Sequence, residues 1–188
     1  YRQFALWGMP AALLNALGAA LPPLLLSACY GQDVTGQFSL AAKMIGLPVA
    51  LISSSIGQVF LGEASDVVRT RPSELASLFR RTTRRLSLLA VGVLFLGGIA
   101  PFVFGPIFGS RWTTSGTYAA IMATYLSMQI IVASIFHVAI ILQRQQVQVA
   151  LGFARAVLGI TALTLPAYLG MSALVAISAY AVGQCLVY

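Results

Sequence analysis

The chain has 188 residues, with eleven Lys or Arg, four Asp or Glu and one His, for a formal net charge of +7. Charged residues make up 8% and hydrophobic residues 59% of it, whereas soluble domains carry roughly 25% and 45–50%. This composition excludes an ordinary soluble domain. Because the basic residues border long apolar runs, we expect them to meet anionic lipid headgroups and not nucleic acid.

Long uncharged runs predict the helices in chain order. Charged residues are absent from residues 3–32, 86–110, 112–143 and 156–188, and about 20 apolar residues suffice for a helix to cross a bilayer. The expected spans are 6–30, 34–61, 86–108, 115–142, 147–168 and 171–188. The fold class is therefore predicted to be all-α, a polytopic membrane helical bundle of about six transmembrane helices. Cys29 and Cys185 fall in different spans and predict no disulfide framework.

The arginines fall on alternate gaps between these runs. Arg2, the arginines of the connection 62–85, and Arg144 would occupy every second connection. Such alternation is the positive-inside pattern of a multi-pass membrane protein, so both ends of the chain are predicted to be cytoplasmic. Asp33 and Arg111 then lie outside, and Arg111 is the exception to the charge asymmetry.

The polar connection 62–85 is predicted to contain an amphipathic helix. Ser73 is a suitable N-cap, and Leu75, Leu78 and Phe79 recur at helical spacing. Such a helix would lie in the inner headgroup layer before the third span begins. A solvated orienting loop is the alternative, because topology alone accounts for the arginines. The residues expected at the membrane surface are Arg80, Arg81, Arg84 and Arg85.

Two cations fall inside predicted spans. Lys43 lies about 13 Å below the outer end of its helix, and Arg155 lies about 16 Å past Arg144, near the middle of a core about 30 Å thick. A charge at that depth is disfavoured by at least ~3 kcal/mol unless it meets water or a partner. All four acidic residues lie outside the spans, so the cations predict an anionic ligand or an acid elsewhere in a longer protein. Lys43 could equally snorkel outward.

Polar residues share helix faces with small residues in several spans. Small faces also allow close helix packing, which is the alternative explanation for them. Prolines interrupt several spans, as they do where transporter backbone lines a cavity. The candidate substrate-binding residues are Arg155, Lys43, Asn15, Gln58 and Gln129.

Signals of catalysis are weak. His137 is the single histidine, with no Asp, Glu or second His at ligand spacing, so no metal site is expected. No Ser or Cys has a base nearby in sequence, and no glycine-rich phosphate loop follows a strand. We therefore expect neither enzymatic activity nor a cofactor.

The second span and its surroundings carry a family resemblance. The segment 36–48, GQFSLAAKMIGLP, and the segment 53–60, SSSIGQVF, closely resemble stretches of lipopolysaccharide O-antigen and exopolysaccharide flippases. Those belong to the multidrug/oligosaccharidyl-lipid/polysaccharide exporter superfamily. The segments 63–65, 78–81 and 104–112 also resemble that family, in the order and spacing of its second half.

The resemblance implies a fold of two six-helix lobes around a central cavity, with residues 1–188 as the carboxyl-terminal lobe of a longer protein. It implies transport of an undecaprenyl-pyrophosphate-linked oligosaccharide across the bacterial inner membrane, with Lys43 and Arg155 at basic positions of the family. The implied partners are the lipid-linked oligosaccharide, anionic membrane lipids, the missing amino-terminal lobe and polysaccharide polymerase machinery.

Other functions stay open at this point. A drug or metabolite cation antiporter of the same superfamily would be expected to carry an acidic residue in a span, which could lie in the other lobe. A membrane-embedded transferase of lipid-linked sugars should show paired carboxylates at an interface, for which only Glu63, Asp66 and Glu74 are available. A structural or assembly subunit would leave Arg155 without a purpose.

Overall fold

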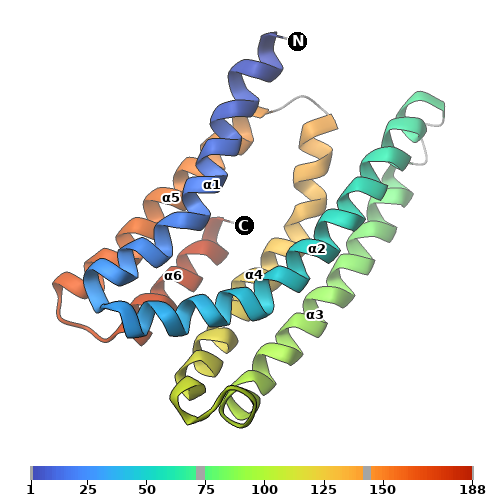
Figure 1. Cartoon of the computed structure of the whole chain (residues 1–188). Coiled ribbons are helices and arrows are strands. Elements are labelled where there is room, and N and C mark those ends of the chain that lie inside the picture. The colour runs from blue at the N-terminus through green and yellow to red at the C-terminus, as the bar shows by residue number, and fades with distance from the viewer. Residues whose placement is uncertain (1, 71–74, 142–144, 188) are drawn as a thin grey trace.

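The computed structural model describes residues 2–70, 75–141 and 145–187. Within these ranges the chain folds as six α-helices and one 3-10 turn, with no strand (Figure 1). The elements are α1 (Arg2–Tyr30), α2 (Gln32–Thr70), α3 (Leu75–Phe108), η2 (Ser110–Trp112), α4 (Thr113–Ile141), α5 (Gln145–Tyr168) and α6 (Ala173–Val187). The predicted all-α fold class is confirmed.

Three glycines with left-handed backbone end helices where the sequence predicted breaks. Gly31, Gly109 and Gly170 have φ angles of 87°, 95° and 67°. Glycine adopts such angles without the steric penalty that a Cβ brings, so it lets the chain reverse within a few residues. The predicted break at 143–146 falls mostly on residues 142–144, outside the described ranges.

The helices have the length and hydropathy of membrane spans. Three are long and apolar enough to cross a bilayer: Gln32–Ala64, Ser77–Phe108 and Val149–Tyr168 within the described residues. Ala16–Tyr30 and Ala173–Val187 are shorter apolar helices. Large apolar side chains remain exposed along these helices, as expected where lipid is the solvent. The chain is an all-α helical membrane bundle.

The helices pack in two groups that meet at α4 and α6. The most extensive contact joins α3 to α4, and α2 also packs on α4. In the other group α5 packs on α1 and on α6, while α4–α6 and α1–α2 contacts connect the groups (Figure 1). The buried core includes Leu26, Phe38, Ala41, Ala90, Ala100, Tyr118, Ala119, Met122, Leu126, Ile130, Leu163, Ala176, Ile177 and Ala181.

Small residues let α3 and α4 approach each other closely. A Cβ placed on Gly97 would clash with the Cβ of Ala123, and one on Gly116 would lie 2.5 Å from the carbonyl oxygen of Ala100. Close backbone approach through small residues is a common mode of helix association in membranes, where the hydrophobic effect does not drive helices together. Small residues therefore form the packing surface between α3 and α4.

The basic connection differs from its prediction. Residues 62–70 continue α2, and α3 begins at Leu75 and runs without a break through Arg85 into its apolar segment. The amphipathic segment is thus the first turns of the third helix and not a separate helix lying along the headgroup layer. At 1.5 Å per residue, the 34 residues of α3 extend about 50 Å, well beyond a core of about 30 Å. Ser73 lies outside the described residues.

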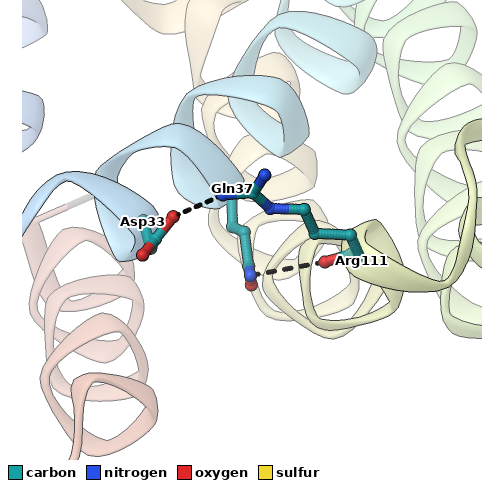
Figure 2. Close-up of polar contacts among 3 residues, drawn as sticks. All are labelled: Asp33, Gln37 and Arg111. Carbon is teal, nitrogen blue, oxygen red and sulfur yellow. Dashed lines mark hydrogen bonds and ion pairs between the residues drawn. The ribbon is translucent and has the colours of Figure 1, made fainter.

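An ion pair joins the α1–α2 turn to the α3–α4 turn. A terminal nitrogen of Arg111 donates to a carboxylate oxygen of Asp33 at 2.9 Å, and the Gln37 amide donates to the Arg111 carbonyl oxygen at 3.5 Å (Figure 2). Both charged side chains are about four-fifths exposed, at 79% and 84%. Arg111, the exception to the charge asymmetry, is therefore balanced by a carboxylate at the same end of the bundle.

Candidate functional site

Arg155 is held by a glutamine of the neighbouring helix. It lies midway along α5, and its Nε donates a hydrogen bond to Oε1 of Gln184 on α6 at 3.1 Å. The amide nitrogen of Gln184 donates in turn to the backbone carbonyl oxygen of Arg155 at 3.3 Å. Arg155 is half-buried and Gln184 is almost fully buried. This reciprocal pair fixes where the guanidinium lies.

A close α5–α6 contact and two tyrosines complete the surroundings of this pair. A Cβ on Gly159, one turn after Arg155, would lie 3.2 Å from the Tyr180 ring and 3.4 Å from the Gln184 amide nitrogen. The Tyr180 ring meets that of Tyr125 on α4 edge to face, with centroids 5.8 Å apart. Three helices therefore converge on this polar cluster, which we define as Arg155, Gly159, Gln184, Tyr180 and Tyr125.

The charge of the cluster sits in a helix group without acidic side chains. The helices that pack on α5 are α1, α6 and, less extensively, α4. None of them carries an Asp or Glu. The partner that the structure gives the Nε of Arg155 is a neutral amide. The Gln184 amide oxygen orients the guanidinium of Arg155, and a guanidinium is a group that can bind phosphate oxygens.

The other predicted substrate-binding residues are not all brought to this cluster. Gln129 is half-buried on α4, one turn after Tyr125, and therefore lies beside the cluster. Lys43 and Gln58 are exposed on α2, which packs on α4, α1 and α3. The side chain of Asn15 lies outside the described residues. The structure thus places Gln129 on the helix that carries Tyr125, and it places Lys43 and Gln58 on α2, in a different helix group from Arg155.

Sequence reasoning missed Gln184 and Tyr180. Gln184 was detectable as an amide within an uncharged run, because a polar side chain in a membrane helix seeks a partner on another helix. Its partner could not be read from the sequence, since helical periodicity assigns faces within one helix and not contacts between helices.

The four predicted surface arginines are exposed on the first turns of α3. The side chain of His137 lies outside the described residues. Among the residues that the structure describes, no group of three His, Cys, Asp or Glu could hold a metal ion.

Fold and site define a helical membrane protein with a half-buried cation held between two of its helices, α5 and α6. Residues 1–117 match the family model of polysaccharide biosynthesis proteins. The match covers more than half of the chain, so the chain belongs to that family and has a role in polysaccharide biosynthesis. Comparisons with curated proteins and with solved structures found no match. The matched residues include Lys43 and the basic start of α3, whereas Arg155 and Gln184 follow them.

Proposed function

We propose that the protein is a flippase that moves an undecaprenyl-pyrophosphate-linked oligosaccharide across the bacterial inner membrane, in O-antigen, exopolysaccharide or capsule biosynthesis. In this proposal the chain acts as a transporter and not as an enzyme. It forms the carboxyl-terminal lobe of a two-lobed exporter, and the amino-terminal lobe supplies the other wall of the substrate path. Polysaccharide polymerase machinery would receive the transported oligosaccharide.

The observation that carries the proposal is the position of Arg155. A guanidinium midway along a membrane helix is disfavoured by at least ~3 kcal/mol unless its surroundings compensate it, so such residues mark substrate pathways. Gln184 holds this guanidinium through Nε, and guanidinium groups bind phosphate oxygens with two parallel hydrogen bonds. A pyrophosphate-linked lipid is an anion of this kind, and family membership supplies the polysaccharide context.

Lys43 supports the same proposal at a second place. It is exposed on α2, where the partner lobe of a two-lobed exporter could cover it. A cation on each helix group would allow the pyrophosphate to pass from one to the other without either holding it too tightly.

Surface polysaccharide of the native host tests the proposal. Cells producing full-length protein with Arg155→Ala are expected to lose the polysaccharide, with normal amounts of protein in the membrane fraction. Arg155→Lys is expected to fall well below wild type, because an ammonium cannot form the bidentate contact. Arg111→Ala is the matched control, since it removes an arginine of the exposed ion pair, and it should retain the polysaccharide. Normal polysaccharide from Arg155→Ala would contradict the role of Arg155.

A further inference from the structure

An apolar cavity of about 390 Å³ lies between α2 and α3. Its walls are the α2 turns from Met44 to Ser53 and the α3 turns from Leu88 to Phe104, and Ile130 of α4 closes it on a third side. The lining is almost entirely aliphatic and aromatic. A cavity of this size falls in the range that holds small-molecule ligands, and an apolar one between membrane helices is suited to a hydrocarbon chain.

The α3 wall of the cavity is long compared with one leaflet of a bilayer. Its α3 wall covers the 16 steps from Leu88 to Phe104, or about 24 Å at 1.5 Å per residue. Half of a hydrocarbon core about 30 Å thick is about 15 Å, the depth reached by the acyl chains of one leaflet. The α2 wall covers the 9 steps from Met44 to Ser53, or about 14 Å. The α3 face therefore extends beyond the part that both helices enclose, and it offers a surface to a chain that is longer than an ordinary phospholipid tail.

Two arginines stand at the end of the cavity near Leu88. Arg81 and Arg85 are one turn apart, and at 3.6 residues per turn they share the α3 face that lines the cavity. Arg80 and Arg84 fall on other faces of the same turns. All four side chains are exposed. An anionic headgroup beside Arg81 and Arg85 would leave its hydrocarbon chain at the start of the cavity, because Leu88 follows Arg85 by less than one turn.

We infer that this cavity binds the polyprenyl chain of the lipid-linked substrate, with the phosphate of that lipid at Arg81 and Arg85. The inference rests on the proposed function and adds a second contact region to the polar cluster. The chain length of the lipid and the charge at the cavity's end favour this occupant over membrane phospholipid. The polyprenyl chain stays in the cavity between α2 and α3 while the headgroup of the lipid crosses the membrane.

Two glycines of α3 provide a matched test. Gly92 lines the cavity, and a Cβ there would meet no atom within 4 Å, so Gly92→Leu would fill the space without forcing the helices apart. Gly98 is also exposed with no atom within 4 Å of a Cβ, and it does not line the cavity. Gly98→Leu is thus the same change on another face of the same helix.

Binding of undecaprenyl phosphate to the full-length protein in phosphatidylcholine nanodiscs is the measurement. Gly92→Leu is expected to weaken binding at least about tenfold, because excluding two or more methylene groups from an apolar site has that effect. Gly98→Leu should bind as wild type does. Arg81→Gln with Arg85→Gln should weaken binding more than the equal charge change Arg80→Gln with Arg84→Gln.

Each contrary result has a distinct meaning. Equal binding by wild type and Gly92→Leu would overturn the inference and leave the proposed function standing. Equally effective competition by phosphatidylglycerol would identify ordinary membrane lipid as the occupant and would also overturn it. Failure of wild type to bind undecaprenyl phosphate would overturn the inference, while the polysaccharide assay of the Arg155 variants would still test the proposed function by itself.

Discussion

Arg155 and Gln184 show how a charge can be kept inside a membrane helix bundle. The guanidinium donates through Nε to the side-chain Oε1 of Gln184, and the Gln184 amide nitrogen donates back to the backbone carbonyl oxygen of Arg155. Hydrogen bonds to charged groups contribute about 1.5–3 kcal/mol, which is comparable with the cost of placing an arginine near mid-bilayer. A carboxylate at position 184 would hold the guanidinium more tightly but would compete with any anionic substrate.

This reasoning predicts different readouts for two substitutions of Gln184. Gln184→Glu keeps an acceptor for Nε and adds a negative charge that offsets the lost amide donor to the Arg155 carbonyl oxygen, so it is expected to keep the stability of the bundle while reducing polysaccharide export. Gln184→Leu removes the acceptor and is expected to reduce both thermal stability and export. Melting temperature and surface polysaccharide of the two variants check the prediction. Normal export by Gln184→Glu would show that the pair serves packing alone.

The Asp33–Arg111 ion pair is expected to contribute little to stability. Both side chains are largely exposed, and such pairs contribute about 0–1 kcal/mol. Asp33→Asn should therefore leave the melting temperature of the detergent-solubilised protein almost unchanged. The same is expected in low salt and in 0.5 M NaCl, a concentration of the order at which exposed ion pairs are screened. A fall in melting temperature as large as that caused by a core substitution would contradict this and would mean that the ion pair holds the two turns together.

At the scale of single residues, the sequence predicted which side chains are unusual but not which ones meet. Arg155 stood out because charge inside an apolar run is costly, and that argument needs no structure. Gln184 acquires its role only through its contact with α5. Lys43 and Gln58 share a sequence region with the family resemblance, yet they lie on a helix group apart from Arg155.

At the scale of helices, the glycine turns were predictable and the true lengths of α2 and α3 were not. Positive φ angles at Gly31, Gly109 and Gly170 end helices near the predicted points. The connection 62–85 was expected to contain an amphipathic surface helix, because Leu75, Leu78 and Phe79 recur at helical spacing. Helix continuity depends on backbone hydrogen bonds, however, and Ala, Leu, Glu and Arg sustain these outside the membrane as well as within it.

Neighbouring glycines of α3 allow a test of the α3–α4 contact. Gly97→Leu is expected to destabilise the protein strongly, because its Cβ would clash with that of Ala123 across the tightest contact of these helices. Overpacking of a well-packed core typically costs about 1–3 kcal/mol. Gly98→Leu, one position on and exposed, is the control. In the same detergent, Gly97→Leu should have a lower melting temperature than Gly98→Leu. Equal melting temperatures would contradict the close packing of α3 and α4.

At the scale of the whole molecule, alternating helices and alternating arginines give one orientation. The turns at Gly31, Gly109 and Gly170 lie at one end of the bundle, while α1 begins and α6 ends toward the other (Figure 1). The basic start of α3 lies at the second end. The positive-inside rule predicts that this second end faces the cytoplasm, and the ion-paired Arg111 does not offset this asymmetry.

Cysteine accessibility tests the orientation. In a background with Cys29→Ser and Cys185→Ser, a membrane-impermeant thiol reagent applied from the periplasm should label Asp33→Cys and Thr113→Cys. It should not label Ser77→Cys, which is exposed on the basic start of α3. Labelling of Ser77→Cys in intact cells, with no labelling at Asp33→Cys, would reverse the predicted orientation.

The central claim is that Arg155 binds the pyrophosphate during transport, and reconstituted transport tests it most directly. The full-length protein in liposomes would be given a fluorescent undecaprenyl-pyrophosphate-linked oligosaccharide, and its movement between leaflets would be followed by quenching from outside. The account predicts that wild type transports the lipid and that Arg155→Ala slows transport about 10–100-fold, the equivalent of one charge-assisted contact. An unchanged rate in Arg155→Ala, at equal reconstituted protein, would contradict the account.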